Sequence, residues 1–475
     1  MNKYYVTIGL EIHIELNTQT KMFSPSLCTH EGQPNTHINP IDLAMPGTLP
    51  SVNANAVKKA IKLANALHME LHPHPITFDR KNYYYWDLPK GFQITQQFNP
   101  IGTNGYVVLN DGNETKIKIE RIHMEEDTAK QLKVEGTNDV LLNYNRCGVP
   151  LIEIVSCPDM HSADQVQQYL HALHEICVFM DVSDAKMEEG SMRADVNISL
   201  SKDPNKLGTK VEVKNINSIS NAAQAVEYEI KRQGLMLDQN LQVDQETRRF
   251  DDVTGTTIFM RKKVDAIDYK YMTEANILAI DLPNQFIDDA LKEITVHPYE
   301  VRKLLLANKL SDKDINILLS NKHLYDYFME IYTLTNEYKD AARWVLNELL
   351  GAINKQEKTF NDVTNQEKKD LLTLIKDYKA GKFNTKQAKD LFNDIFVSHL
   401  DYKTQLNKLL ASSKSFSEQD LQKMINDLLS QHPETKQDLL THYDKAEKFI
   451  TGSLMKLTKG QANPVLIKQL LMKMK

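Results

Sequence analysis

The sequence predicts an α+β fold in which a mainly antiparallel sheet domain comes first and helices follow. Before residue 290, short runs of alternating apolar and polar residues are bounded by Gly, Pro, Asn and Asp, which is typical of strands and turns. After residue 290, apolar pairs recur at helical spacing, and only four of the 17 glycines occur there. A chain of 475 residues corresponds to about two to four domains. We therefore expect a sheet-based domain and a helical part that is itself divided in two.

The expected elements follow from the periodicity of each segment. Residues 6–16, 193–200 and 210–214 alternate apolar and polar side chains, so each predicts a strand with one apolar and one polar face. The runs 106–109 and 114–119 predict a hairpin, because Asn-Asp-Gly-Asn joins them. Helical spacing predicts helices over residues 57–67, 163–180, 341–350, 370–378 and 420–429.

Composition argues against several classes of protein. Hydrophobic residues at 41% and charged residues at 25% are ordinary globular values, unlike those of disordered or fibrous chains. The four cysteines show no CxxC spacing and are too sparse for a disulfide scaffold, which fits a reducing compartment. No run of about 18 uncharged apolar residues occurs, and the first residues lack the apolar core of a signal peptide. We expect a cytoplasmic protein that does not insert into a membrane.

Charge is unevenly distributed along the chain. The net charge of −6 divides into 28 Lys and Arg against 39 Asp and Glu in residues 1–290, and 29 against 24 in residues 291–475. No acidic residue follows Glu447, but lysines do: Lys448, Lys456, Lys459, Lys468, Lys473 and Lys475. Such a field favours a polyanion, such as nucleic acid, bound at the C-terminal end. A solvated helical face without a partner is the alternative, and charge alone favours it.

The polar faces of the predicted strands carry carboxylates and one imidazole. Glu11 and His13 share the polar face of the first strand, and Arg193 and Asp195 share that of a later one. Glu153 interrupts an apolar run, where an unpaired ionised carboxylate would be costly to bury. If these faces belong to one sheet, they form a concave surface rich in carboxylates. The alternative for any one segment is that its polar face is the solvated side of an antiparallel sheet.

This composition of side chains suggests metal-assisted phosphoryl transfer. Carboxylate-rich sites without thiols suit Mg²⁺ or Mn²⁺, and these ions usually arrive with phosphate. The protein would then position groups and neutralise charge. Neither a P-loop nor a GxGxxG motif occurs in the chain. The basic residues that would meet an anionic substrate are Lys81, Lys90, Arg193, Lys210 and Lys214.

Seven segments, read together, resemble a known family: GatB, the B component of the aspartyl/glutamyl-tRNA(Asn/Gln) amidotransferase. The resemblance runs nearly end to end, and seven motifs in the same order are far more specific than any one of them. The segments are residues 8–13 (IGLEIH), 45–50 (MPGTLP), 78–85 (FDRKNYYY), 124–127 (MEED), 150–155 (PLIEIV), 187–193 (MEEGSMR) and 459–464 (KGQANP).

The resemblance implies a two-step repair of misacylated tRNA by a heterotrimer. The GatB component of that complex uses ATP to phosphorylate the side-chain carboxylate of Glu or Asp attached to tRNA(Gln) or tRNA(Asn). Ammonia from the amidase (A) component then displaces the phosphate, and a small (C) component ties the two larger ones together. A carboxylate and a triphosphate repel each other, so a divalent cation is expected to shield them. The implied cofactors are ATP and Mg²⁺ or Mn²⁺.

The resemblance also implies a domain order and residue roles. It implies a cradle-like catalytic domain without a P-loop over residues 1–292, a helical domain over 293–400 and a YqeY-like tRNA-binding tail over 401–475. The implied metal ligands are Glu11, His13, Glu126 and Glu153. Glu189 and Asp195 are second choices, and we predict catalytic roles for them and for Glu153. Arg80, Lys81 and Lys90 are expected at the nucleotide and substrate edge, with Arg193, Lys210 and Lys214. The lysines predicted to contact tRNA are Lys448, Lys456, Lys459 and Lys468.

Two departures from the family pattern affect these expectations. Many relatives carry four zinc-binding cysteines, and the corresponding positions here are Ser24, Ser26, Asn39 and Asp42, so we expect no structural zinc. Residues 268–276 read DYKYMTEAN where the family usually reads D-Y-R-Y-F-x-E-P-D, and Lys270 would replace Arg imperfectly in a bidentate contact.

Two alternative functions remain at this stage. One is a drifted, non-catalytic tRNA-binding adaptor of the same complex, and the other is a ligase that acts on a small acid. The joint presence of Glu11, His13, Glu126 and Glu153 speaks against the adaptor, because a scaffold does not need them as a set. The sequence leaves open whether Glu-tRNA(Gln), Asp-tRNA(Asn) or both are substrates.

Overall fold

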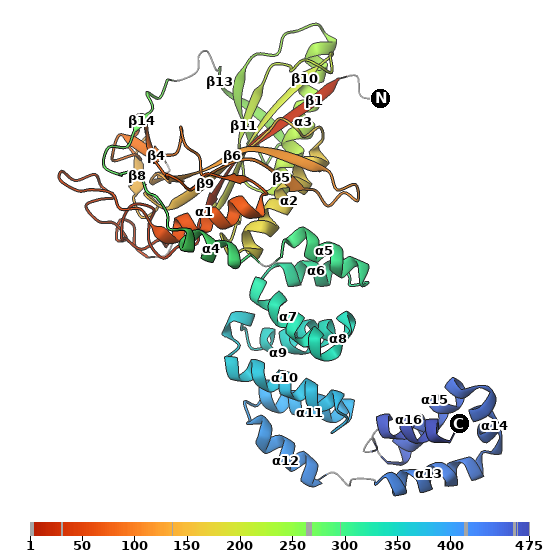
Figure 1. Ribbon diagram of the computed structural model, residues 1–475. Helices are drawn as coiled ribbons and strands as arrows, with labels where there is room; N and C mark the ends of the chain where they lie inside the picture. Colours follow the sequence, from red (N-terminus) through yellow and green to blue (C-terminus); the bar gives the residue numbers. More distant parts are fainter. Residues whose placement is uncertain are drawn as a thin grey trace. The chain divides into compact units, whose positions relative to one another are not determined.

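The chain forms two compact units in the computed structural model, which describes residues 4–29, 32–134, 136–262, 268–294, 296–412, 417–458, 462 and 464–474. The first unit comprises Met1–Leu304 and Leu319–Lys322, and the second comprises Leu305–Leu318 and His323–Lys475. The first is built on a sheet and the second is helical (Figure 1). The predicted α+β class is therefore confirmed, whereas the three-domain division at residues 292 and 400 stays a prediction.

A large twisted sheet organises the first unit. Within the described residues its strands follow the order β13-β12-β11-β10-β1-β9-β6-β5-β2. All neighbours are antiparallel except β11 and β12, which are parallel. The strands are β1 (Tyr5–Glu15), β2 (Glu70–Leu71), β5 (Gly102–Val108), β6 (Lys116–Glu126), β9 (Pro150–Ser156), β10 (Met192–Ser201), β11 (Val211–Ile216), β12 (Glu246–Asp251) and β13 (Thr256–Lys262).

Three helices pack on one face of this sheet. They are α1 (Ala54–Ala66), α2 (Ala163–Phe179) and α3 (Ile219–Asp238), and they contact one another in series and the strands beneath them. The side chains of Asn53, Ser162 and Ser218 cap their N-termini by accepting backbone N–H bonds. On β10, Leu200 lies beside Gly234 of α3, so the apolar alternate residues of β1 and β10 face the helices.

A small second sheet borders the opposite face. It contains β3 (Asp79–Asn82), β4 (Phe92–Thr95) and β14 (Met272–Thr273), with β3 in the middle. Strand β4 contacts β6, and the Thr95 hydroxyl donates to a Glu125 carboxylate oxygen at 3.4 Å. A hairpin of β7 (Lys130–Lys133) and β8 (Val140–Asn143) and the helix α4 (Asn284–Lys292) complete this part, with α4 against α1.

Helices continue from the first unit into the second. They are α5 (Pro298–Ala307), α6 (Asp312–Leu319), α7 (Lys322–Thr335), α8 (Tyr338–Ala342), α9 (Leu350–Asn354), α10 (Asn365–Lys379), α11 (Thr385–Phe396) and α12 (Tyr402–Ser412). A π-helical segment, η1 (Arg343–Leu349), joins α8 to α9, and a 3₁₀ turn, η2 (Phe360–Asp362), precedes α10. The predicted helix over residues 341–350 is thus helical throughout, but most of it is π-helix.

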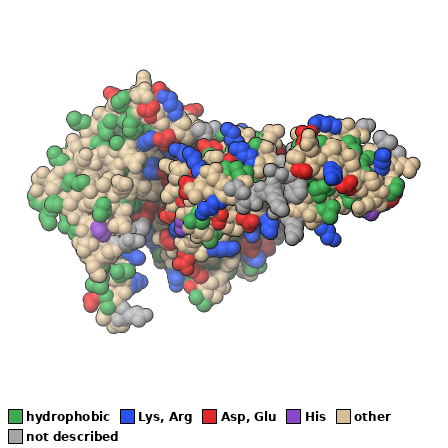
Figure 2. Space-filling view, turned by 90° about the horizontal axis from the view of Figure 1, so that it is seen from below, with side chains coloured by type: hydrophobic (Ala, Val, Ile, Leu, Met, Phe, Trp, Pro, Cys, Tyr) green, Lys and Arg blue, Asp and Glu red, His purple; other side chains and the backbone are tan. Residues whose placement is uncertain are grey.

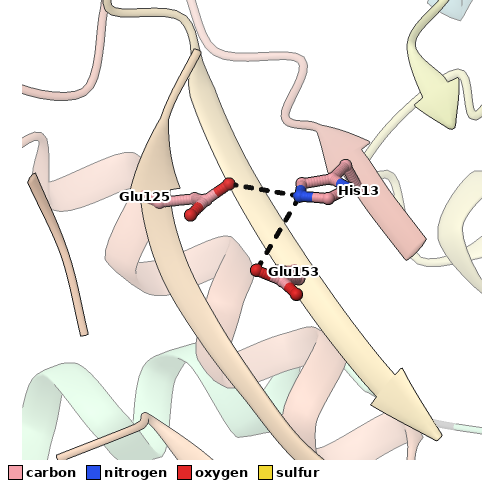
Figure 3. A group of neighbouring side chains, drawn as sticks. All are labelled: His13, Glu125 and Glu153. Atoms are coloured by element: carbon pink, nitrogen blue, oxygen red, sulfur yellow. Dashed lines mark ion pairs between the residues drawn. The ribbon is translucent and has the colours of Figure 1, made fainter. Parts of the chain in front are cut away.

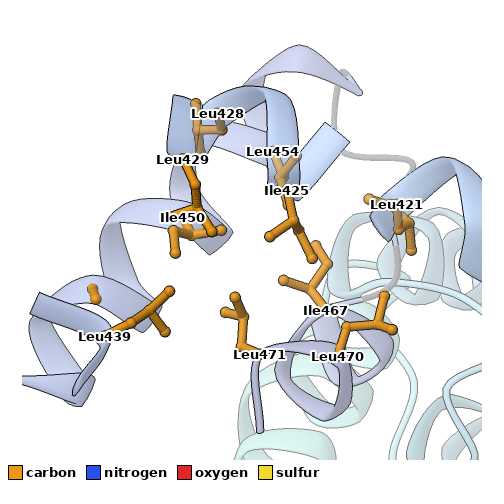
Figure 4. Packing of buried hydrophobic residues seen from close by; sticks show 12 residues of the cluster. Leu421, Ile425, Leu428, Leu429, Leu439, Ile450, Leu454, Ile467, Leu470 and Leu471 are labelled. Carbon is orange, nitrogen blue, oxygen red and sulfur yellow. The ribbon is translucent and has the colours of Figure 1, made fainter. Parts of the chain in front are cut away.

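The last helices share a core of their own. These are α13 (Glu418–Gln431), α14 (Pro433–Thr441), α15 (Tyr443–Leu457) and α16 (Pro464–Lys473). Figure 4 shows leucine and isoleucine side chains from all four helices meeting in this core. Burial of these residues holds short helices together that would be marginal alone. Among the described residues, none of the helices combines the length and the apolarity that crossing a bilayer requires.

Candidate active site

A histidine and two glutamates converge on the sheet face opposite α1–α3. His13 on β1, Glu153 on β9 and His123 on β6 stand directly opposite one another in register, so they share this face. Glu125 lies two residues after His123 and therefore also faces this way. His13 Nε2 is 3.5 Å from Glu125 Oε1 and 3.7 Å from Glu153 Oε2. Figure 3 shows the three side chains pointing toward one another. We call His13, Glu125 and Glu153 the first acidic cluster.

The surroundings keep Glu153 ionised. His123 Nε2 lies 3.1 Å from Glu153 Oε2 and 3.8 Å from Glu125 Oε2. Burial alone would raise the pKa of Glu153, but the hydrogen bond and charge of His123, with the charges of His13 and Lys81, outweigh burial and lower it. The carboxylate is therefore negative at neutral pH, as a cation ligand must be.

Lys81 brings a cation to this cluster from β3 of the small sheet. Burial would lower the pKa of Lys81, but the nearby Glu125, Tyr271 and Glu153 raise it above its usual value. The ammonium is therefore protonated at neutral pH. Its Nζ atom lies 4.9 Å from the centre of the Tyr269 ring, a cation–π contact. The first acidic cluster thus has a fixed positive charge at one edge and tyrosine rings beyond it.

A second acidic cluster lies further along the same sheet and consists of Glu11, Asp195 and Glu212. Glu11 and Asp195 are opposite each other on β1 and β10, and Glu212 follows on β11. Their ligand atoms lie within 4.8 Å of one another. Lys214 Nζ forms an ion pair with Asp195 and lies 3.2 Å from Glu212 Oε1. Burial would lower the pKa of Lys214, but these acids raise it, so an ammonium lies beside this cluster.

Glu126, a predicted metal ligand, lies outside both clusters. Glu125 also contacts β4, through Thr95, but Glu126 has other partners. Its carboxylate pairs with Lys90 and accepts the backbone N–H of Ile94 at 3.0 Å. Glu126 and Lys90 therefore form one buried pair that joins β6 to β4, instead of facing His13.

Two predicted arginines are held by buried acids. Arg193 Nη2 donates to Asp127 Oδ2 at 2.7 Å, and Arg146 Nε lies 3.4 Å from the same oxygen. Arg80 donates two bonds, of 2.7 and 2.9 Å, to the Glu274 carboxylate. Arg193 is opposite His13 in the register, so its guanidinium borders the first acidic cluster. Both guanidinium groups have fixed positions before any substrate binds.

Two further predicted residues lie in exposed positions. Glu189 forms an exposed ion pair with Lys186 in the turn before β10, with Nζ to Oε1 at 2.7 Å. Lys210 is exposed immediately before β11. Neither side chain belongs to an acidic cluster among the described residues.

Sequence reasoning did not select His123, Glu125 or Glu212. The strand β6 carries a bulge between Ile119 and Arg121 relative to β9, which changes the phase of its alternation. After that bulge, buried apolar residues alternate with His123 and Glu125. Alternation in this segment alone would therefore have placed His123 and Glu125 on the same face. Alternation over residues 210–214 did place Glu212 on the polar face with Lys214, but no role was predicted for it.

The four positions at which many relatives carry zinc-binding cysteines are joined by hydrogen bonds in this chain. The hydroxyls of Ser24 and Ser26 each donate to the Asp42 carboxylate at 2.6 Å, and the Asn39 backbone N–H donates to it at 3.0 Å. Lys21 Nζ lies 3.4 Å from Asp42 Oδ2. Oxygen groups around a buried lysine are a poor match for Zn²⁺, which favours thiolate and imidazole. The absence of structural zinc stays a prediction.

The altered segment 268–276 lies against the small sheet. Lys270 forms an exposed ion pair with Asp268, whereas Tyr269 and Tyr271 lie near Lys81. The bidentate partner in this segment is Glu274, which binds Arg80. The lysine at position 270 therefore points away from the first acidic cluster.

The predicted tRNA-binding lysines lie in α15 and α16. Lys448 and Lys456 are exposed on α15, and no ion pair involves them among the described residues. Lys468 Nζ lies 3.1 Å from Glu447 Oε1. Lys459 lies outside the described residues. Figure 2 shows Lys and Arg side chains interspersed with Asp and Glu over the described helical region, without a patch of one sign alone.

The fold and the site together define a class of enzyme: an α+β protein whose open sheet face, without a P-loop, carries acidic clusters bordered by lysine and arginine. Residues 6–288 match the family described as the GatB/GatE catalytic domain, and residues 326–474 match the GatB domain. The chain belongs to the GatB family, the B components of the aspartyl/glutamyl-tRNA(Asn/Gln) amidotransferases, which are ligase-type enzymes.

Relatives that carry this B-component name match over nearly their full length. The Ureaplasma urealyticum protein is 44% identical over 98% of this chain and 98% of its own length. The protein of Malacoplasma penetrans is 41% identical over 99% of this chain and 97% of its own. That of Mycoplasma mycoides subsp. mycoides is 41% identical over 100% and 99%. The resemblance inferred from seven sequence motifs is thus confirmed.

Proposed function

We propose that this chain uses ATP to phosphorylate the side-chain carboxylate of Glu or Asp on misacylated tRNA(Gln) or tRNA(Asn). Ammonia from an amidase (A) component then displaces the phosphate, and a small (C) component completes the heterotrimer. The names of the relatives support a tRNA-dependent amidotransferase made of several chains. The observation that carries the proposal is the first acidic cluster with Lys81 at its edge. The four free cysteines support action in the reducing cytoplasm.

The first acidic cluster fits a divalent cation. The two carboxylates, without thiols, suit Mg²⁺ or Mn²⁺, and His13 would be the one nitrogen ligand. Neighbouring ligands of Mg²⁺ at about 2.1 Å are roughly 3 Å apart. The separations of His13 Nε2 from Glu125 and Glu153, 3.5 and 3.7 Å, are only slightly larger. When bound, the cation would neutralise charge between the triphosphate and the substrate carboxylate.

The surrounding side chains would orient the two anionic substrates. Lys81 remains protonated at neutral pH and offers three N–H donors to phosphate or carboxylate oxygens. Arg193 borders the same cluster and is held by Asp127, so it needs little reorganisation to bind an anion. In the second acidic cluster, a further cation would have to displace the ammonium of Lys214.

The C-terminal helices would hold the tRNA by its phosphates. Lys448 and Lys456 are exposed on one helix, and the acid-free C-terminal stretch adds further lysines. Such contacts are independent of base sequence and position the RNA without reading it. Mutations in the acidic cluster would therefore affect phosphoryl transfer, whereas mutations in the C-terminal helices would affect tRNA binding.

The test uses the full chain with its amidase and small components, ATP, Mg²⁺ and either Glu-tRNA(Gln) or Asp-tRNA(Asn). Glu153→Gln keeps the side-chain shape and removes its charge, and His13→Ala removes the imidazole. We expect ADP formation to fall to background in both variants, with tRNA affinity changed by no more than about twofold, because phosphate contacts elsewhere hold the tRNA. Glu120→Gln is the matched control, since Glu120 is an exposed glutamate on β6.

Two results would contradict the proposal. Unchanged ADP formation by Glu153→Gln and His13→Ala would refute the site. A wild-type complex that binds the aminoacylated tRNA but forms no ADP would favour the adaptor alternative instead.

A further inference from the structure

Four tyrosine rings form a row beside the first acidic cluster. The ring centres of Tyr85 and Tyr83 are 5.7 Å apart, those of Tyr83 and Tyr269 are 5.9 Å apart, and those of Tyr269 and Tyr271 are 6.0 Å apart. The segments that carry them are far apart in sequence and join where β14 pairs with β3. We call these four residues the tyrosine row.

Lys81 connects the tyrosine row to the acidic cluster. Its Nζ atom lies 4.9 Å from the ring centre of Tyr269 and 5.8 Å from that of Tyr83. The same ammonium is close enough to Glu125 and Glu153 for their charges to raise its pKa. Lys81 therefore lies beside the two middle rings of the row, and the row passes along the acidic cluster toward the exposed Tyr85.

The row is open to a ligand at Tyr85 and half-buried at Tyr83, Tyr269 and Tyr271. Neighbouring planes cross at 65–70°, so each pair uses the face of one ring only, and most faces are not covered by another tyrosine of the row. Tyr85 is 58% exposed, and the adjoining Tyr84 and Trp86 are 89% and 63% exposed. Contiguous exposed aromatic side chains of this kind mark interaction sites in folded proteins.

We propose that the tyrosine row stacks the unpaired bases at the aminoacylated 3′ end of the tRNA substrate. This inference rests on the proposed function, in which the reacting carboxylate is carried by an amino acid esterified to the terminal ribose. When that carboxylate is at the first acidic cluster, the terminal base must lie close to it. Stacking on aromatic rings accepts any base and suits a single-stranded end.

The length of the row favours an RNA end over the base of ATP. ATP brings one base, whereas the row offers successive rings from Tyr271 to Tyr85. Lys81, beside the two middle rings, is placed to meet phosphate or carboxylate. The adenine of ATP and a partner protein are alternative ligands of the tyrosine row, and the experiment distinguishes each of them from the tRNA end.

The experiment uses the full chain and a tRNA whose 3′-terminal adenine is replaced by 2-aminopurine, a base whose fluorescence is quenched by stacking. The variants are Tyr269→Leu and Tyr85→Leu, with Tyr269→Phe and Tyr85→Phe as matched controls that keep the ring. Tyr5→Leu removes an exposed tyrosine elsewhere in the unit. We expect quenching by the wild type, the Phe variants and Tyr5→Leu, and its loss in the Leu variants.

The affinity for this tRNA should fall in the Leu variants by about 5- to 150-fold, the range that base–aromatic stacking supplies. The ratio of wild-type to variant affinity should be the same at low and high salt, because stacking releases no counterions. Tyr85 is exposed, so Tyr85→Leu preserves the test if Tyr269→Leu fails to fold.

Three outcomes would overturn the inference. They are quenching that persists in the Leu variants, a KM that changes for ATP but not for tRNA, and a loss of complex assembly with tRNA affinity unchanged. A wild-type complex that quenches the probe but forms no ADP would overturn the proposed function and leave stacking supported. One that forms ADP without any quenching would do the reverse.

Discussion

Replacing Asp127 with Asn should destabilise the sheet next to the candidate site. The Asp127 carboxylate is 5% exposed, pairs with Arg193 at 2.7 Å and with Arg146 at 3.4 Å, and accepts the Thr128 backbone N–H at 2.8 Å. The substituted amide would keep the shape but remove the charge, which leaves two guanidinium groups without their acid. Breaking a fully buried pair costs about 3–5 kcal/mol. Because Arg193 is 36% exposed and water can solvate it, we expect about 2–3 kcal/mol.

The pH dependence of this change has a definite sign. Burial would raise the pKa of Asp127, but Arg193 and Arg146 outweigh it and lower the pKa below its ordinary value. The charged form therefore contributes its full stabilisation above the pKa of the unfolded chain, about 4. That stabilisation is lost as the pH falls through the lower pKa of the folded state. The difference between wild type and Asp127→Asn should be constant from pH 8 to about pH 5 and shrink below about pH 4.

Hydrogen exchange measures this effect locally, which is necessary because a chain of two compact units need not unfold in one step. Protection of the amides of β6 and β9 should fall by about 30- to 150-fold at pH 7, the equivalent of the expected free energy. Asp139→Asn is the control, because Asp139 is exposed in the loop before β8. Equal protection in wild type and Asp127→Asn, or a difference that grows on acidification, would refute the reasoning.

Two further predictions concern the C-terminal helices. Ile450→Ala removes a fully buried side chain from the core of α13–α16 and should lower the free energy of unfolding of these helices by about 2–5 kcal/mol. Hydrogen exchange of the helices measures this loss. Phe449→Ala is the control and should lower it far less, because Phe449 is exposed. Replacing both Lys448 and Lys456 with Gln should flatten the dependence of tRNA affinity on log salt by up to about 1.8, at roughly 0.9 per phosphate contact. Lys445→Gln is the control for that filter-binding assay, since Lys445 is paired with Asp438. An unchanged slope in the double variant would mean that α15 is a solvated helix without contact to tRNA.

The backbone elements were predictable because their signals are local. Alternation over residues 6–16 predicted β1 and its two faces, and Ile8, Leu10 and Ile12 are indeed buried toward the helices. The Asn-Asp-Gly-Asn turn predicted the hairpin of β5 and β6, and Val108 pairs with Lys116. Helical spacing predicted α1, α2, α10 and α13 to within a few residues. Each of these signals depends on neighbours along the chain.

The side chains of the site were predictable only in part, because their grouping depends on register between distant strands. His13 and Glu153 were selected, and the antiparallel register of β1 and β9 brings them together. Glu126 was selected instead of Glu125 from its position in the family motif, which does not show which of two adjacent glutamates faces His13; the phase of β6 changes at the bulge after Ile119. The partners of the cations, such as Lys90 with Glu126 and Arg80 with Glu274, have no local signal at all.

The first acidic cluster differs from the neighbouring acidic residues in the positive charges that are paired with it. Glu126, Asp127 and Asp195 each form an ion pair with a lysine or arginine. Among the described residues, the ion-pair partners of Glu125 and Glu153 are histidines, which carry charge only when protonated. Two carboxylates this close repel each other when both are ionised, with Lys81 as the nearby cation. A divalent cation would relieve that repulsion here more than at any of the paired acids, and this is the electrostatic reason to expect the metal at His13, Glu125 and Glu153.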